Sequence, residues 1–269
     1  MIPKDGNRFS DNPNAQTKIG SMPGLDWLTA RPLAHRGLHD ASSGIIENTA
    51  SAFSAAITGG YGIETDLQVS ADGEVMVHHD DALGRLTEGT GYLNALSARE
   101  IKAVHFKGTA DRIMSLGELC DLVAGRVTLL LELKSRFDND RRLAKRTAEL
   151  LSGYSGRVAV MSFNPEMIEA IRRADPDLTR GIVAERHYSH HERDAMPRWE
   201  KLRLAWLLHA PRSRPQFIAY SIKDLPAAAP LVARSIFGLP LLTWTVRTQE
   251  DRKIATRWAD QIIFEGWRP

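Results

Sequence analysis

Residues suited to acid–base chemistry and metal binding are concentrated between Leu33 and Asp80. They fall in five short segments, which read in chain order LAHRG (33–37), ENT (47–49), ETD (64–66), DG (72–73) and HHD (78–80). Histidine exchanges protons near neutral pH, carboxylates bind divalent cations, and arginine holds phosphate groups. Hydrolysis of a phosphodiester near neutral pH uses all of these groups. The stretch therefore predicts an enzyme.

The bulk composition is that of an ordinary globular protein. Of the 269 residues, 43% are hydrophobic and 25% are charged, and the formal net charge is +2. This balance does not call for nucleic acid or an anionic membrane as a partner. The single cysteine, Cys120, excludes an internal disulfide framework and weakly favours a reducing compartment.

No targeting or membrane-spanning segment is evident. The N-terminal residues are polar and lack the apolar core of a signal peptide, and no run of about 18 apolar residues occurs in the chain. We therefore expect a cytoplasmic protein with no integral membrane segment and with a flexible leader over residues 1–24. The oligomeric state is left open.

Short apolar runs alternate with longer amphipathic stretches along most of the chain. Several of the runs are apolar throughout, which is typical of parallel strands buried on both faces. The intervening stretches carry helix signals, such as the capping box that Ser115 forms with Glu118. The strand-like runs are 32–35, 62–69, 75–79, 127–134, 157–163, 178–185, 216–222, 239–246 and 260–265.

Eight strands remain when 75–79 is treated as a hairpin continuation of 62–69. Strands alternating with helices over about 240 residues predict an α/β fold, a (β/α)8 TIM barrel, as a single domain over 25–269. A doubly wound sheet is the alternative, although no G-x-G-x-x-G follows the first strand. Residues 80–114 break the alternation and are expected to be a small insertion after the second strand. The chain ends too early for a full eighth helix, so the segment LDWLTA (25–30) is expected to cover the barrel instead.

In such a barrel the active site lies at the carboxyl ends of the strands. The candidates follow strand-like runs in pairs: His35 and Arg36, Glu64 and Asp66, and Glu132 and Lys134. Residues two apart on a strand project to the same side, so each of the last two pairs is expected to point one way. Converging carboxylates indicate a hard cation such as Ca²⁺ or Mg²⁺. The alternatives without a catalytic role are that Glu64 and Asp66 form a solvated pair and that Glu132 and Lys134 form a structural ion pair.

The order of these motifs, continued by LELK, SFN and WTV, resembles the glycerophosphodiester phosphodiesterase family from about Leu33 to Trp244. The resemblance implies a (β/α)8 barrel with a small insertion after the second strand, which suits residues 80–114. It also implies hydrolysis of glycerophosphodiesters to glycerol 3-phosphate and an alcohol with the help of one divalent cation.

The resemblance further implies roles for individual residues. The acid–base pair would be His35 and His79, the metal ligands Glu64, Asp66 and Glu132, and the phosphate-binding residues Arg36 and Lys134, with Glu47 as a further carboxylate of the site. One histidine would deprotonate the glycerol hydroxyl for attack on phosphorus while the other protonates the departing alcohol, and which one starts as the base is left open. His79 is chosen over His78 because it precedes Asp80, whereas His78 is expected to be a packing residue.

Two aromatic residues and three departures from the family pattern concern the substrate. Phe163 and Trp244 are expected either to line an apolar wall near the substrate or simply to pack the barrel. Arg247 stands where an Asn is common, and Phe264 and Glu265 stand where a Thr-Asp pair is usual. These departures are expected to affect the rim of the substrate site more than the metal site.

The sequence is also compatible with three other functions. The histidine-rich segment HYSHHERD (187–194) would suit a zinc hydrolase, although no H-E-x-x-H is present. A catalytically inactive barrel would serve as a binding module. A lysophospholipid-directed phosphodiesterase would need an apolar surface near the site, and the amphipathic stretch 198–211 offers either that or an ordinary helix packed on the barrel.

Overall fold

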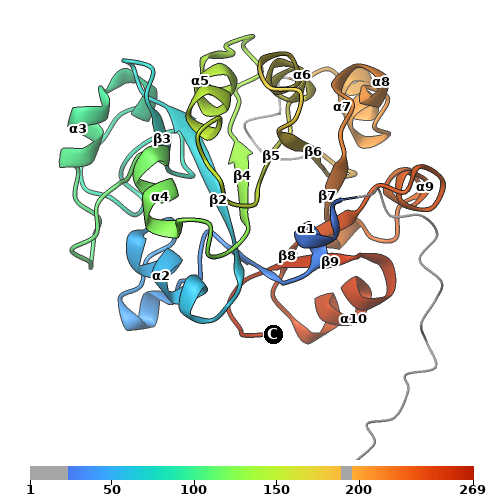
Figure 1. Ribbon diagram of the computed structural model, residues 1–269, viewed down its shortest axis with the longest axis horizontal. Coiled ribbons are helices and arrows are strands. Elements are labelled where there is room, and N and C mark those ends of the chain that lie inside the picture. Colours follow the sequence, from blue (N-terminus) through green and yellow to red (C-terminus); the bar gives the residue numbers. More distant parts are fainter. Residues whose placement is uncertain (1–23, 189–195) are drawn as a thin grey trace, which may run out of the picture.

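The computed structural model describes residues 24–188 and 196–269. Its centre is a sheet whose strands run in the order β1-β9-β8-β7-β6-β5-β4-β2-β3, with a further pairing of β1 with β2 (Figure 1). The strands are β1 (Leu33–His35), β2 (Gly62–Val69), β3 (Val75–Val77), β4 (Leu129–Leu133), β5 (Val158–Ser162), β6 (Thr179–Ala184), β7 (Phe217–Ser221), β8 (Leu241–Val246) and β9 (Gln261–Phe264).

The first strand closes the barrel. Leu33 of β1 pairs in parallel with Gly62 of β2 on one side and with Ile263 of β9 on the other. All neighbouring pairs are parallel except β2 with β3, an antiparallel hairpin. The prediction of a (β/α)8 barrel with 75–79 as a hairpin continuation is therefore confirmed, and the doubly wound alternative is wrong.

Helices surround this barrel (Figure 1). The capping box expected at Ser115 and Glu118 begins α4, and Asn164 caps the start of α6. The helices are α1 (Asp26–Thr29), α2 (Ala50–Thr58), α3 (Ala98–Ala103), α4 (Leu116–Val123), α5 (Arg142–Leu151), α6 (Pro165–Ala174), α7 (Arg198–Ala205), α8 (Ala210–Ser213), α9 (Ala228–Phe237) and α10 (Gln249–Trp258), with short 3-10 turns at Ala41–Ser43, Leu93–Ala95 and Ile222–Asp224.

The barrel interior is filled by apolar side chains from successive strands. Leu33, Leu130, Val183 and Phe217 belong to one buried cluster, and Leu28 of α1 packs into it. Helix α1 thus covers the barrel next to the start of β1, as expected for residues 25–30. Since the barrel has a packed interior, polar side chains can gather only at its ends and surface.

Residues 80–114 lie between β3 and α4 and contain helix α3 and the 3-10 turn Leu93–Ala95. They form a small apolar cluster of their own, in which Leu83, Leu93, Ile101 and Phe106 are buried. The insertion therefore packs mainly on itself and on Met76 of β3, and leaves the order of the barrel strands unchanged.

The stretch 198–211 differs from the expected single helix. It forms α7 and the short α8, because Leu207 adopts a left-handed backbone (φ 55°) that ends the first helix. Residues 1–23 of the leader expected over 1–24, and most of the histidine-rich segment (189–194), lie outside the described residues, so these two predictions stay untested. Among the described residues, no helix is long and apolar enough to span a membrane, and the cytoplasmic location stays a prediction.

The turn after β1 depends on a glycine. Gly37 has a φ of +81°, and a Cβ there would lie 2.9 Å from both the carbonyl carbon and the Cβ of Ala52. We expect Gly37→Ala to lower the free energy of unfolding, measured by urea denaturation, by about 2 kcal/mol or more. Gly108→Ala is the matched control: its φ is +79° with nothing within 4 Å of the added carbon, so only the backbone penalty of about 1 kcal/mol applies. Equal losses in the two variants would contradict the close approach.

Candidate active site

The candidate residues meet at the carboxyl ends of the barrel strands. The strand register places His35 beside Glu64 and Asp66 beside Glu132. Since β1, β2 and β4 are neighbours in the barrel, residues far apart in sequence become adjacent at one edge. The pairs Glu64 with Asp66 and Glu132 with Lys134 point into this edge together, as the two-residue spacing predicts.

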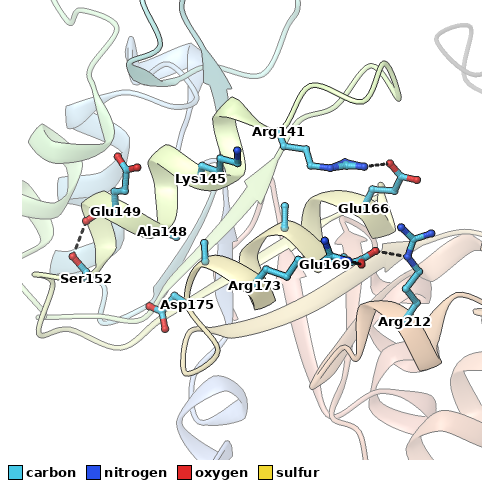
Figure 2. Close-up of a pocket in the computed structure, with 12 residues that line it drawn as sticks. Arg141, Lys145, Ala148, Glu149, Ser152, Glu166, Glu169, Arg173, Asp175 and Arg212 are labelled. Carbon is cyan, nitrogen blue, oxygen red and sulfur yellow. Dashed lines mark hydrogen bonds and ion pairs between the residues drawn. The ribbon is translucent and has the colours of Figure 1, made fainter.

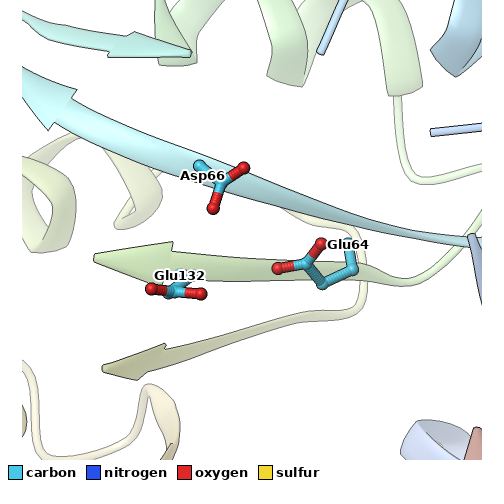
Figure 3. Close-up of side chains that lie close together, drawn as sticks. All are labelled: Glu64, Asp66 and Glu132. Carbon is cyan, nitrogen blue, oxygen red and sulfur yellow. The ribbon is translucent and has the colours of Figure 1, made fainter. Parts of the chain in front are cut away.

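Three carboxylates form the centre of the site. One carboxylate oxygen from each of Glu64, Asp66 and Glu132 lies within 4.8 Å of the other two, and all three side chains are buried (Figure 3). Burial, together with the charges of Asp66 and Glu132, raises the pKa of Glu64 well above its ordinary value. An oxygen-lined cluster of this kind is suited to a divalent cation.

Two cations offset the charge of this cluster. The Lys134 ammonium lies 2.8 Å from Asp66 Oδ1 and 2.9 Å from Glu132 Oε1, and Arg36 Nε lies 3.3 Å from Asp66 Oδ2. Burial alone would raise the pKa of Asp66, but Lys134 and Arg36 hold it well below its ordinary range. The two neighbouring groups therefore shift in opposite directions: the ionised form of Asp66 and the protonated form of Glu64 are favoured.

A further residue positions Asp66. The side-chain amide of Asn48 donates to Asp66 Oδ2 at 2.9 Å, and its carbonyl accepts from Thr65 Oγ1 at 2.6 Å. Asn48 adopts a left-handed backbone (φ 58°), which Asn tolerates better than most residues. The side-chain cap of α2 is Thr49, so the side chain of Asn48 is available for this contact. The sequence signal available for this contact was the Asn at position 48, because Asn tolerates a left-handed backbone.

His35 is held by a carboxylate from the last strand. Its Nδ1 lies 2.6 Å from Oε2 of Glu265, and the same oxygen accepts from Arg247 Nη2 at 2.8 Å. Its other ring nitrogen, Nε2, lies 4.0 Å from Glu64. Burial lowers the pKa of His35, and the hydrogen bond to Glu265 partly offsets this effect. Glu265 therefore contacts His35 directly, and Arg247 contacts His35 through Glu265.

A carboxylate also holds the ring of His79. Its Nδ1 lies 2.8 Å from Oδ1 of Asp80, and Asp80 accepts from Arg85 Nε at 2.6 Å. Arg85 also reaches Glu47 Oε1 at 2.7 Å, and Glu47 is in turn 2.6 Å from Arg36 Nη1. Glu47 thus positions the two arginines and is not among the residues that line the pocket.

Residues beside these histidines point elsewhere. His78 is buried and packs near the ring of Phe106 at 6.4 Å, the position that strand alternation predicts for a packing residue. Phe264 is also buried, against Tyr61 and Trp267 on the helix side of the barrel. The expectation that Phe264 shapes the substrate rim is therefore wrong, because it alternates away from the pocket.

A pocket of about 460 Å³ opens over the cluster. Phe163 and Trp244 form one wall, with ring centroids 5.5 Å apart in an edge-to-face arrangement. Trp244 is held in place by a hydrogen bond from its Nε1 to the carbonyl of Ala219 at 3.1 Å. The pocket is lined by His35, Arg36, Glu64, His79, Glu132, Lys134, Met161, Phe163, Val183, Trp244, Thr245, Arg247 and Ile263.

A larger pocket, of about 750 Å³, lies along α5 and α6 on the outside of the barrel (Figure 2). Its charged groups are largely paired with one another: Arg141 with Glu166, and Glu169 with both Arg173 and Arg212. None of the candidate residues lines it. We therefore place the active site in the smaller pocket, where the carboxylates and the two histidines meet.

Comparison with known proteins identifies the family of the chain. A sequence model of the Glycerophosphoryl diester phosphodiesterase family matches residues 35–264, which include the candidate residues from His35 to Trp244. The chain belongs to this family. It is an enzyme of the glycerophosphodiester phosphodiesterase type. The family resemblance seen in the sequence is therefore confirmed, and family membership argues against a non-catalytic binding module.

Individual relatives have modest identity. The chain is 30% identical over 161 residues to a glycerophosphodiester phosphodiesterase of Caldanaerobacter subterraneus, covering 56% of this chain and 65% of that protein. It is 27% identical over 245 residues to human glycerophosphodiester phosphodiesterase 1, covering 82% of this chain and 72% of that protein.

Solved structures share the fold. An Oleispira antarctica phosphodiesterase in complex with the product sn-glycerol-3-phosphate has a TM-score of 0.72 at 21% identity, covering 88% of this chain and 94% of that one. A glycerophosphodiester phosphodiesterase of Thermotoga maritima has a TM-score of 0.65 at 22% identity, with 86% and 92% covered. At this identity the likeness supports the barrel fold alone.

The contact between Glu265 and His35 leads to a test by NMR titration. The hydrogen bond and charge of Glu265 raise the pKa of His35, so Glu265→Gln should move the titration of the His35 ring to lower pH. Glu250→Gln is the control, because Glu250 is exposed on α10 and is paired with Lys253. If His35 titrates at the same pH in both variants, Glu265 does not hold the imidazole in solution.

Proposed function

We propose that the chain hydrolyses glycerophosphodiesters to glycerol 3-phosphate and an alcohol, with one divalent cation and two histidines as acid and base. One observation carries the proposal: a buried cluster of three carboxylates lies in the same pocket as two histidines whose Nδ1 atoms are both held by carboxylates. Family membership supports the reaction class, and the names of the relatives support the substrate class.

The donor set fits a hard divalent cation. Glu64, Asp66 and Glu132 offer oxygen only, and their ligand atoms lie within 4.8 Å of one another. Oxygen ligands of this kind suit a hard divalent cation such as Ca²⁺ or Mg²⁺. Bound there, the cation would offset the charge of a phosphate and lower the pKa of a hydroxyl group near it.

The side chains supply the remaining chemistry. Arg36 and Lys134 line the pocket and present positive charge to a phosphate. With Nδ1 of His35 held by Glu265 and Nδ1 of His79 held by Asp80, each ring keeps Nε2 for the substrate. One ring takes the proton of the attacking hydroxyl and the other protonates the departing alcohol, after which the roles reverse for water.

The proposal predicts the loss of turnover when either histidine is removed. His35→Ala and His79→Ala should each lower kcat for glycerophosphocholine by about 100-fold or more, the usual contribution of a general acid or base. Release of glycerol 3-phosphate measures the effect. His105→Ala, an exposed histidine of the insertion, is the control and should keep wild-type turnover.

The same assay tests the substrate and the cation. Turnover of glycerophosphocholine or glycerophosphoethanolamine that is lost with a chelator supports the proposal. Turnover restricted to a lysophospholipid would keep the site and reject the proposed substrate. If both alanine variants stay within about tenfold of wild type, the two-histidine mechanism is wrong.

The raised pKa of Glu64 makes cation binding dependent on pH. Without a cation, Glu64 takes up a proton more readily than an ordinary Glu. The contribution of Glu64 to the stability of the fold is therefore greatest at low pH and falls as pH rises through its raised pKa. A cation must displace that proton, and binding therefore strengthens with rising pH. We expect added Ca²⁺ to raise Tm more at about pH 8 than at about pH 5.

A matched variant separates this effect from general changes with pH. Glu64→Gln cannot ionise, so the increase in Tm caused by Ca²⁺ should be smaller and should vary less between the two pH values. Asp111→Asn, in the insertion away from the pocket, should behave as wild type. An increase in Tm that is the same at both pH values in the wild-type chain would contradict proton displacement from Glu64.

A further inference from the structure

We propose that α7 and the turn after it bind the surface of an anionic lipid bilayer. Four large apolar side chains of this segment face solvent: Trp199 is 66% exposed, Leu202 59%, Trp206 56% and Leu208 67%. Trp199, Leu202 and Trp206 are spaced three and four residues apart, so they share one face of the helix. Figure 1 shows α7 and α8 at the outer edge of the molecule, beside α6.

The opposite face of α7 is firmly packed. Leu204 is fully buried, and it forms a small cluster with Ala205, Tyr188 and the partly buried Phe163. The helix is therefore anchored by its inward face, and the exposed tryptophans belong to an ordered surface. Exposed apolar groups gathered in this way mark an interaction site rather than the scattered exposure common to most surfaces.

The charges on α7 identify the kind of partner. Within the described residues Arg198 and Lys201 form no ion pair, whereas the acidic residue of the helix, Glu200, is paired with Arg203. The exposed tryptophan and leucine side chains therefore lie next to the exposed Arg198, and the half-buried Lys201 adds a second positive charge to the helix. Tryptophan is favoured at the level of lipid headgroups, and basic residues are attracted to anionic lipids.

A second copy of the chain fits this face less well. A twofold contact through α7 would bring together two helices that each carry Arg198 and Lys201, with no unpaired carboxylate on either helix to offset these charges. Anionic headgroups would neutralise both charges. Helix α9 is a weaker candidate for binding anionic lipid. Its Ile236 and Phe237 are also exposed, but its arginine, Arg234, is already paired with Asp260.

The proposed surface lies close to the active-site pocket without forming part of it. Phe163 touches the buried face of α7 and also forms the pocket wall with Trp244. The outward residues Trp199 and Trp206 do not line the pocket. Changing them should therefore leave hydrolysis of a dissolved diester unaltered, and the binding proposal can fail independently of the proposed function.

Co-sedimentation of the full chain with vesicles tests the proposal. We expect the wild-type chain to bind phosphatidylcholine vesicles that contain phosphatidylserine, and to bind pure phosphatidylcholine vesicles much more weakly. Trp199→Ala with Trp206→Ala should weaken binding by about tenfold or more, and Arg198→Glu with Lys201→Glu by at least as much. Tyr92→Ala is the control, because Tyr92 is an aromatic residue 59% exposed on the insertion.

Each outcome decides the proposal. Loss of binding in both double variants, with Tyr92→Ala unchanged and glycerophosphocholine turnover retained, supports it. Wild-type chain that fails to bind phosphatidylserine vesicles at low salt overturns it, as does binding that the α7 variants leave intact. Light scattering that shows a dimer abolished by the tryptophan variants, without vesicle binding, would assign the surface to a second copy instead.

Discussion

The burial of three carboxylates at one point of the barrel is the constraint on which the rest of the site depends. Ionised carboxylates cannot share a buried space without compensation, because each loses its hydration and repels the others. The fold compensates in two ways. Lys134 and Arg36 favour the ionised form of Asp66, and the raised pKa of Glu64 favours the protonated form of that group. A divalent cation would replace the proton, which is why we treat the cluster as a binding site rather than a structural ion pair.

Arg36 connects this cluster to the rest of the site. Its backbone N–H donates to Glu64 Oε2 at 3.2 Å, while its side chain contacts Asp66 and Glu47. Glu47 passes the network on to Arg85, which holds the partner of His79. The position of the His79 ring is thereby tied to the charges that surround the acidic cluster. Such supporting contacts fix ring orientation and are as much a part of an active site as the reacting groups.

Much of this arrangement was predictable from the sequence, because it follows from periodicity. Apolar runs located the strands, and the two-residue spacing of ETD and ELK placed their carboxylates on one side. Contacts that join distant segments were not predictable in this way. Asn48, which contacts Asp66, has a left-handed backbone, and so does Leu207, just beyond the end of α7 at Ala205. Hydrophobic pattern does not report backbone handedness at a single residue, nor which face of a short helix stays uncovered.

The two unusual residues at the end of the barrel are best understood together. Arg247 and Glu265 both depart from the family pattern. In the structure, one carboxylate oxygen of Glu265 contacts both His35 and Arg247. The longer glutamate side chain spans the distance to His35, and both His35 and Arg247 hold its pKa far below the ordinary value. The lowered pKa favours the ionised form of Glu265. An ionised carboxylate at this position can fix the ring and stabilise its cation, which suits the proton transfer that we propose for His35.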